Sequence, residues 1–237
     1  VARVGTPVLV LDTEMSKEDH LNRIIANLSG VPINEVATGK FVDDDEKSQR
    51  VHEAVEQIQD IPYNYVSVAG KPFEQILNII KRWIIQDVKQ DENGRTNDCV
   101  VVYDYLKLMS STSITNNIQE YQALGFQITN LHNLAVKYDF PCLSFVQLNR
   151  DGITKESTDA VSGSDRLIWL CTSFSIFKIK SPEELAEDGP RAGNRKLVPI
   201  VSRHGAGLDD GDYINMRMLG EHAKLQELRT RNEFLVM

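Results

Sequence analysis

Short apolar runs that favour β-strands alternate with amphipathic stretches that favour helices through the first 150 residues. The strand-like runs are PVLVLDTE (7–14), YNYVSV (63–68), CVVVYDYL (99–106) and CLSFVQL (142–148), and helical patterns cover residues 17–30, 44–60, 72–88 and about 118–137. Parallel strands need long crossover connections, which are usually helices. The alternation therefore predicts an α/β fold whose core is a mainly parallel, twisted sheet flanked by helices.

Local signals mark the ends and faces of the first two helices. Ser16 is a favourable N-cap residue, and Gly30 is placed to end the first helix. In the second helix, Val51, Val55 and Ile58 recur at helical spacing. We expect these three side chains to lie on one face of the helix.

Beyond residue 150 the helical periodicity disappears. Strand-like runs cover residues 166–180, 196–202 and 212–219, and a charged insertion with Gly and Pro at 181–195 is expected to be an exposed loop. This pattern predicts antiparallel strands at the C-terminal edge of the fold. The length of the chain favours a single domain over residues 1–237.

Cysteine usage, net charge and the length of the apolar runs limit the classes of function. Cys99, Cys142 and Cys171 lie in separate apolar runs without C-x-x-C spacing, which indicates reduced core residues in a cytoplasm-like compartment. The formal net charge of −8 argues against a chain coated in basic surface but permits a local basic channel. Acidic runs such as VDDDE (42–46) are interpreted as solvated turns and helix starts. No apolar run approaches the roughly 20 residues that span a bilayer, so we expect neither a membrane protein nor a secreted one.

Polar side chains stand at the ends of three of the predicted parallel strands, namely Glu14, Asp104 and Gln147. Ligands of open parallel sheets bind beyond the carboxyl ends of the strands, so three convergent tips form a candidate site. Four apolar residues followed by Asp104 match the Walker B pattern, in which the carboxylate helps to hold Mg²⁺. A neighbouring carboxylate can act as general base toward water, and a neutral amide can sense the γ-phosphate. Taken singly, each acid could equally cap a helix or belong to a turn.

Together these motifs resemble the replicative hexameric DNA helicases of the DnaB type, including their phage relatives, in the RecA-like motor domain. VLVLDTEM resembles the family's strand-and-glutamate motif, GVPINEVATGKF its next connecting segment, VVVYDYLKLM its Walker B, LSFVQLNR its sensor strand and IVSRHGAG its arginine-finger strand. The similarity covers nearly the whole chain in order. It implies a RecA-like domain that couples NTP hydrolysis to translocation along single-stranded DNA.

The resemblance also implies a role for each matched residue. Glu14 would be the catalytic base, Asp104 the metal ligand for Mg²⁺, and Gln147 the sensor that couples hydrolysis to movement; Asp104, Gln147 and Arg203 would contact ATP or another NTP. Arg203 would be a finger inserted into the neighbouring subunit's nucleotide site. Without the family, Arg203 is interpreted as a surface residue beside a Gly turn. The sequence departs from the family at Val201, where a lysine is usual.

A phosphate loop, G-x-x-x-x-G-K-[ST], is absent from these 237 residues. In the family that loop and most of its helix precede the strand that PVLVLDTEM resembles, so we expect a domain truncated at the N-terminus after the phosphate loop, and one that does not hydrolyse NTP by itself. Two alternatives stay open. One is a recombinase-type or clock-type RecA-like ATPase, and the other is a non-catalytic RecA-like module that docks on a helicase or a primase.

Nucleic-acid contacts and partners follow from the same resemblance. The family's channel-facing loops correspond to residues 110–117 and 149–165, and the candidate DNA-binding residues are Arg150, Lys155, Ser162 and Gly163. Flexible surface loops are the alternative interpretation of these segments. The implied partners are single-stranded DNA, five further copies in a homo-hexameric ring, a primase and a helicase loader, in the cytoplasm of a bacterium or of a phage-infected host.

Overall fold

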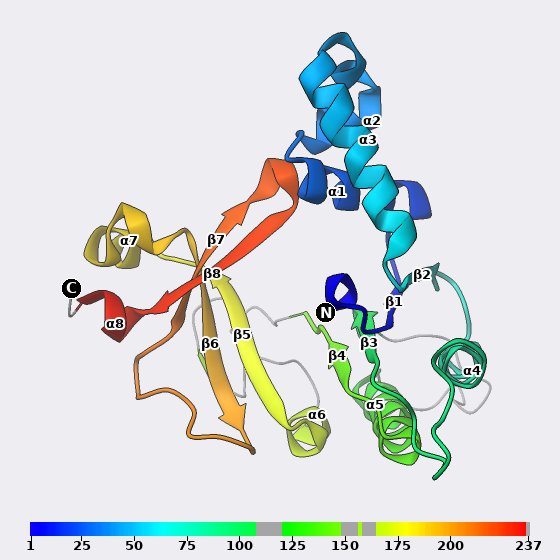
Figure 1. The fold of residues 1–237 in the computed structure, drawn as a ribbon. Coiled ribbons are helices and arrows are strands. Elements are labelled where there is room, and N and C mark those ends of the chain that lie inside the picture. Colours follow the sequence, from blue (N-terminus) through cyan, green and yellow to red (C-terminus); the bar gives the residue numbers. More distant parts are fainter. Residues whose placement is uncertain (108–119, 148–155, 158–164, 236–237) are drawn as a thin grey trace. The chain divides into compact units, whose positions relative to one another are not determined.

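The computed structural model describes residues 1–107, 120–147, 156–157 and 165–235 (Figure 1). The chain forms two compact units, each built from several stretches of sequence. The first unit comprises Val1–Leu21, His52–Gln147 and Val161–Leu170, and the second comprises Asn22–Val51, Leu148–Ala160 and Cys171–Met237. Among the described helices, none is both long enough and apolar enough to cross a membrane.

The first unit contains a four-stranded parallel sheet. Its strands are β1 (Val8–Asp12), β2 (Tyr63–Ser67), β3 (Val100–Asp104) and β4 (Cys142–Ser144), in the order β2-β1-β3-β4. Every neighbouring pair is parallel. All the residues of β1 are buried, which is typical of a strand covered on both faces of a parallel sheet. The predicted α/β fold with a parallel sheet is confirmed.

The connections between these strands are helical. α1 (Lys17–Ser29), α2 (Ile33–Thr38) and α3 (Asp45–Asp60) follow β1, α4 (Phe73–Trp83) with a π-helical turn (Ile84–Val88) follows β2, and α5 (Glu120–Tyr138) follows β3. α4 buries one apolar face, and its Trp83 Nε1 donates a hydrogen bond to Asn64 Oδ1 on β2 at 3.1 Å. The start of the helix predicted for 118–137 lies outside the described residues.

The ends of α1 agree with the prediction, and α3 buries only part of the face that carries Val51 and Val55. Ser16 Oγ accepts a hydrogen bond from a backbone N–H in the first turn of α1 at 3.0 Å, and Gly30 adopts φ +68° beyond its last turn. On α3, Val51 and Ala54 are buried whereas Val55 is 38% exposed. Positions three and four residues after Val51 both lie on its side of the helix, and of these two the small Ala54 takes the buried position.

The second unit contains a four-stranded antiparallel sheet in the order β5-β6-β7-β8. Its strands are β5 (Ser173–Ile179), β6 (Arg195–Ser202), β7 (Ile214–Leu219) and β8 (Lys224–Thr230), and the unit also holds α7 (Pro182–Asp188) and α8 (Arg231–Leu235). The predicted antiparallel strands in the C-terminal part of the chain are confirmed. β8 is an additional strand that the apolar pattern does not indicate.

Two predictions for this part of the chain are wrong. The apolar run 166–180 becomes a strand only at Ser173, because its first part is α6 (Asp165–Leu170) in the first unit; a short apolar run does not distinguish a strand from a buried helix. The insertion 181–195 is largely helical rather than a loop. Ser181 Oγ accepts from the Glu184 N–H and the Glu184 carboxylate accepts from the Ser181 N–H, which is the reciprocal capping box that starts α7.

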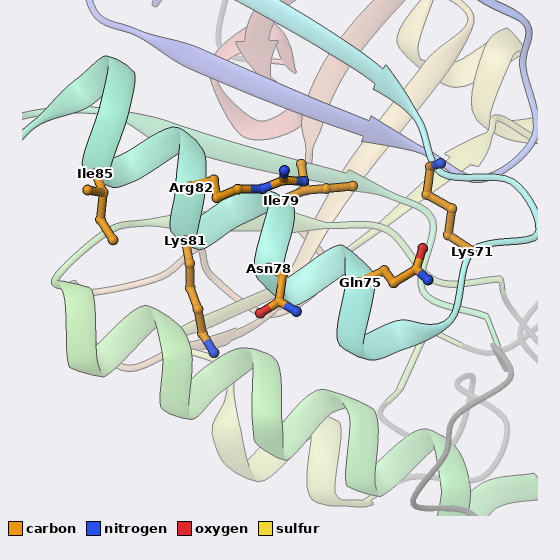
Figure 2. Close-up of a pocket in the computed structure, with 7 residues that line it drawn as sticks. All are labelled: Lys71, Gln75, Asn78, Ile79, Lys81, Arg82 and Ile85. Atoms are coloured by element: carbon orange, nitrogen blue, oxygen red, sulfur yellow. The ribbon is translucent and has the colours of Figure 1, made fainter.

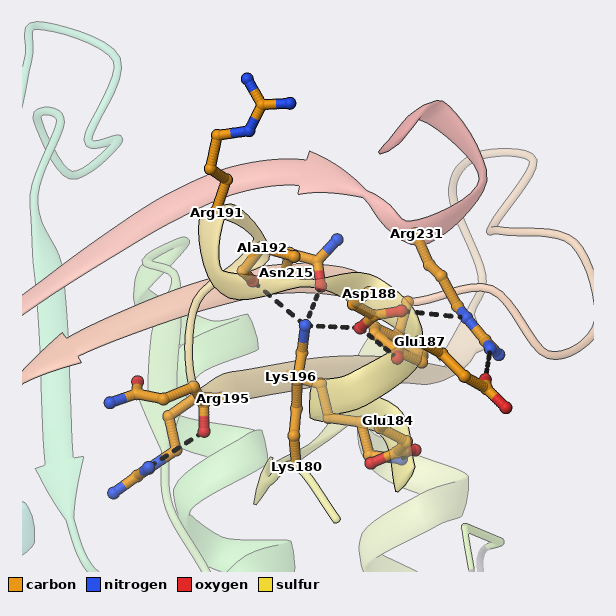
Figure 3. A network of polar contacts seen from close by, with 12 residues as sticks. Lys180, Glu184, Glu187, Asp188, Arg191, Ala192, Arg195, Lys196, Asn215 and Arg231 are labelled. Carbon is orange, nitrogen blue, oxygen red and sulfur yellow. Dashed lines mark hydrogen bonds and ion pairs between the residues drawn. The ribbon is translucent and has the colours of Figure 1, made fainter. Parts of the chain in front are cut away.

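A buried ionic network joins α7 to the antiparallel sheet (Figure 3). The Lys180 side chain is fully buried, and its Nζ donates to Asp188 Oδ2 at 2.6 Å and to the side chain of Asn215. Tyr213 OH donates to the same Asp188 oxygen at 2.7 Å, and Arg231 of α8 lies 3.3 Å from the other one. Buried charges persist only when they are paired and hydrogen-bonded. The network therefore fixes α7 and α8 against β7 within this unit.

Gly193 lies between α7 and β6 at a point where no side chain fits. Its φ is +77°, and a Cβ would come within 2.3 Å of the Met216 carbonyl oxygen. We therefore expect Gly193→Ala to lower the free energy of unfolding by at least about 2 kcal/mol, as measured by urea denaturation. Gly189 is the matched control, because it has a similar φ of +79° but nothing within 4 Å of a Cβ. Equal losses at the two positions would contradict a steric clash at Gly193.

Candidate functional site

The chain leaves β1 through a turn that presents Glu14. Asp12, the last residue of β1, is paired with Asp104 in the register of β1 and β3. Asp12 is 2% exposed, and its Oδ1 accepts hydrogen bonds from the backbone N–H groups of Glu14 and Met15, both at 2.7 Å. A carboxylate that bonds the backbone two residues ahead makes an Asx-turn. Glu14 is thus held on a turn two residues beyond the strand, rather than at its last position.

Side chains of β2 hold the same turn. Tyr65 OH donates to the Met15 carbonyl oxygen at 2.9 Å, and Ser67 Oγ donates to it at 3.2 Å. Partial burial, followed by the nearby Asp12 carboxylate, raises the pKa of Tyr65 to about 12. Tyr65 therefore remains a protonated donor at neutral pH, and its ring stacks on His20 with 3.9 Å between centroids. Side chains of β2 thus help to fix the turn that carries Glu14.

Residues that follow β3 contact the Glu14 side chain directly. Tyr105 OH donates to Glu14 Oε1 at 2.9 Å, and Lys107 Nζ lies 3.8 Å from the same oxygen. Lys107 Nζ also donates to the Thr13 carbonyl oxygen at 3.0 Å. The Glu14 side chain is 57% exposed, so its carboxylate is oriented and still open to solvent. A general base needs both properties, because it must hold its position and reach the water that it deprotonates.

The pKa of Tyr105 reports on its hydrogen bond to Glu14. The hydrogen bond to Glu14, followed by partial burial, raises the pKa of Tyr105 above its ordinary value of 10.0, because a phenolate beside a carboxylate is unfavourable. We expect Glu14→Gln to lower the pKa of Tyr105 toward that value, since glutamine carries no charge. A pH titration followed by NMR of isotope-labelled tyrosine measures the change. Glu18→Gln, at an exposed position of α1, is the control, and an unchanged Tyr105 pKa in E14Q would contradict the contact.

Asp104 ends β3 and is half-buried. Its carbonyl oxygen accepts a hydrogen bond from the Thr13 N–H at 2.9 Å, and the peptide bond to Tyr105 is cis. The described part of the chain holds no group of three His, Cys, Asp or Glu side chains that could bind a metal ion by themselves. Mg²⁺ in nucleotide sites usually takes one or two carboxylates together with substrate phosphates. A single carboxylate at Asp104 fits that donor set.

Gln147 follows β4, which is shorter than predicted. The strand ends at Ser144 rather than near residue 148, because its described neighbour β3 itself ends at Asp104. Two further backbone hydrogen bonds, from the Phe145 N–H to the Tyr103 carbonyl oxygen at 3.2 Å and from the Leu106 N–H to the Phe145 carbonyl oxygen at 2.8 Å, keep the chain beside β3. Gln147 is exposed and lies beyond these bonds. The chain segments that carry Glu14, Asp104 and Gln147 therefore all leave the sheet at the carboxyl ends of neighbouring parallel strands.

Arg203 lies in the second unit, directly after β6. Its backbone N–H donates to the Thr172 carbonyl oxygen at 2.9 Å, and its Nε donates to the Cys171 carbonyl oxygen at 2.8 Å. These bonds tie the base of an exposed side chain to the segment before β5. The candidate DNA-binding residues, Arg150, Lys155, Ser162 and Gly163, lie outside the described residues.

Three residues of this site were missing from the sequence-based prediction. Asp12 shapes the turn, while Tyr105 and Lys107 orient the carboxylate of Glu14. The readable signal for Asp12 was an acid directly at the end of a buried apolar run, a typical Asx-turn position. Tyr105 and Lys107 gave no comparable signal, because their role depends on the pairing of β1 with β3.

Comparison with solved structures identifies the fold. The antiparallel C-terminal strands and the parallel sheet match those of RecA-like ATPase domains. The family follows from the sequence itself, because the model of the DnaB-like helicase C terminal domain matches residues 1–162. The chain therefore belongs to the DnaB-like helicase C-terminal domain family, and the predicted resemblance is confirmed. This assignment favours the helicase over the recombinase alternative.

Three solved structures illustrate the similarity. One, described as an ATPase domain, matches with a TM-score of 0.76 at 15% identity, over 94% of this chain and 75% of that chain. A DnaB-like replicative helicase, described together with its interactions with primase, matches with a TM-score of 0.76 at 14% identity, over 94% of this chain and 51% of that one. The RadB recombinase gives 0.51 at 16% identity, over 95% and 80% of the two chains. At these identities the likeness concerns the fold alone. A comparison with curated proteins finds no significant match.

Proposed function

We propose that this chain is the motor domain of a replicative DNA helicase, in which NTP hydrolysis drives translocation along single-stranded DNA. One observation carries the proposal: a chain of the DnaB-like helicase family holds Glu14 and Asp104 after paired parallel strands, with Glu14 fixed by hydrogen bonds and open to solvent. Both compact units are assigned to this single domain over residues 1–237. The site suits hydrolysis, because it pairs an oriented base with an acid of the Walker B type.

Each residue of the site has a distinct task. Glu14 accepts a proton from the attacking water at its carboxylate, with Tyr105 OH holding one oxygen in place. Asp104 binds the Mg²⁺ of the nucleotide, and that ion offsets charge on the phosphates when it is bound. Gln147 senses the γ-phosphate through its amide, and Arg203 offsets negative charge in the site of the neighbouring subunit. The nucleotide is ATP or another NTP.

The phosphate-binding part of the site is not among these residues. The 237 residues contain no G-x-x-x-x-G-K-[ST] loop, which supplies the backbone N–H groups and the lysine that cradle phosphates. We therefore propose that these 237 residues do not hydrolyse NTP by themselves, and we assign the hydrolytic activity to a protein that contains both this domain and such a loop.

The assembly and partners belong to the same proposal. The motor acts as a homo-hexameric ring around single-stranded DNA, with Arg150, Lys155, Ser162 and Gly163 as the DNA contacts, in the cytoplasm of a bacterium or of a phage-infected host. A primase is a further partner, because a DnaB-like helicase of the same fold interacts with primase. A helicase loader is the last of the proposed partners.

Hydrolysis by the complete protein tests this function. The expected result is Mg²⁺-dependent hydrolysis of ATP that single-stranded DNA stimulates. Absence of both hydrolysis and a phosphate loop from the complete protein would instead support the second candidate, a non-catalytic RecA-like module that docks on a helicase or primase. The lack of a phosphate loop in these 237 residues is the observation that keeps this second candidate.

A further inference from the structure

A cationic groove runs along α4 and the π-helical turn that follows it, in the first unit (Figure 2). Its volume is about 460 Å³. It is lined by three cations, two amides and two isoleucines, namely Lys71, Lys81, Arg82, Gln75, Asn78, Ile79 and Ile85. Figure 2 shows Lys71 and Gln75 at one end and Ile85 at the other. The nucleotide site uses none of these residues.

The three cations of this groove form no ion pair within the described part of the chain. No described carboxylate forms an ion pair with Lys71, Lys81 or Arg82. The rest of the chain carries an excess of acids, with a formal net charge of −8. A local cluster of cations on an acidic protein attracts a negatively charged partner.

The apolar part of the groove indicates what kind of acidic partner fits. Ile85, at one end of the groove, is 58% exposed, and Ile79 also lines the groove. Proteins that bind single-stranded nucleic acid usually combine cations with aromatic rings on which bases stack, and none of the described residues that line this groove is aromatic. Two isoleucines among three cations instead suit an acidic peptide segment that presents an aliphatic side chain.

The chain itself carries such a segment at residues 42–46, in the second unit. Val42 is 63% exposed, and it is followed by Asp43, Asp44, Asp45 and Glu46, all exposed. Asp44 caps α3, because its Oδ1 accepts from the Lys47 N–H at 3.0 Å. Asp43 and Asp45 form no ion pair with a described residue. An exposed valine beside four acids complements a groove with two isoleucines and three cations.

We propose that residues 42–46 of one copy of this chain bind the α4 groove of a second copy. The two surfaces are different parts of the same chain, so the contact is heterologous, and contacts of that kind build rings or open filaments. This interface rests on the proposed ring-forming motor and identifies a contact that would hold neighbouring copies together. Association through it must weaken as salt is added, because exposed charges are screened.

Charge reversal tests the interface, with sedimentation velocity of the 237-residue chain at low and high salt as the measurement. We expect Lys81→Glu with Arg82→Glu to weaken self-association at least about tenfold, and Asp43→Lys with Asp45→Lys to do the same. An equimolar mixture of the two double variants should associate again, because each reversed surface meets its opposite charge on the other chain. Matched reversals elsewhere, K17E/K89E and D209K/D210K, all at exposed positions, should associate like the unaltered chain.

Three results would overturn the interface. They are a chain that stays monomeric at low salt, double variants that associate like the unaltered chain, and a mixture that does not associate again. Loss of oligonucleotide binding in K81E/R82E with unchanged self-association would identify the groove as a nucleic-acid site instead. The measurement needs no nucleotide, so a complete protein that hydrolyses NTP while this chain fails to associate would reject the interface and leave the proposed function standing.

Discussion

Replacing Glu14 with glutamine is expected to lower DNA-stimulated NTP hydrolysis by the complete protein by about 10²–10⁴-fold, the range in which general bases contribute. Glutamine keeps the size of the side chain and can still accept the hydrogen bond from Tyr105, which spans 2.9 Å to Glu14. It cannot accept a proton from water. The loss should therefore appear in kcat, with little change in KM, and it is measured by steady-state hydrolysis of ATP.

Glu18→Gln is the matched control for this variant. Glu18 lies exposed in the first turn of α1, four residues beyond Glu14, and its replacement removes the same charge from a neighbouring position. We expect E18Q to retain the activity of the unaltered protein. An E14Q protein that keeps more than about a tenth of the normal kcat would reject the role of Glu14 as base.

Replacing Lys180 with methionine is expected to lower the free energy of unfolding by about 3–5 kcal/mol, the usual cost of removing one partner of a buried ion pair. The side chains of Lys180 and Asp188 are 0% and 1% exposed, and the two charged groups are 2.6 Å apart. Burial opposes ionisation of Asp188, but the hydrogen bonds from Lys180 and Tyr213 outweigh it and keep the pKa of Asp188 below its ordinary value. Asp188 is therefore charged at neutral pH, and K180M leaves this buried negative charge without its lysine partner. Urea denaturation at neutral pH measures the loss.

Two further variants show whether the unpaired Asp188 carboxylate causes the loss of stability in K180M. Lys224 is exposed on β8, so Lys224→Met should change the free energy of unfolding little. K180M combined with Asp188→Asn should be less destabilised than K180M alone, because the buried carboxylate is then gone. If K180M costs no more than K224M, the ion pair does not contribute to the stability of the second unit.

The features of this protein that could be predicted from sequence are those determined by neighbours along the chain. A β-branched run with helices on either side indicates a buried parallel strand, so β1 and β3 were predicted, together with Asp104 at the end of β3. The N-cap at Ser16 likewise depends on residues within one helical turn. The family motifs also made the domain family predictable, because the match over residues 1–162 is itself a property of the sequence.

The features that escaped prediction depend on contacts between distant segments. Tyr105 reaches Glu14 across 91 positions of sequence, and only the pairing of β1 with β3 brings them together. Val55 lies on the helix face of Val51 by spacing, yet packing buries Ala54 instead. α7 is a different case, since its capping box at Ser181 and Glu184 was readable but lay in a stretch whose Gly and Pro content indicated a loop.

The measurement that tests the motor most directly is NTP hydrolysis by a mixture of two inactive variants of the complete protein. E14Q lacks the proposed base, and Arg203→Ala lacks the finger that we assign to the neighbouring subunit's site. In a ring assembled at random from equal amounts of both, about a quarter of the interfaces join an intact Glu14 to an intact Arg203. The proposed motor predicts that each variant alone is nearly inactive and that the mixture recovers about a quarter of the normal rate. A mixture as inactive as its two components would contradict a nucleotide site shared between subunits.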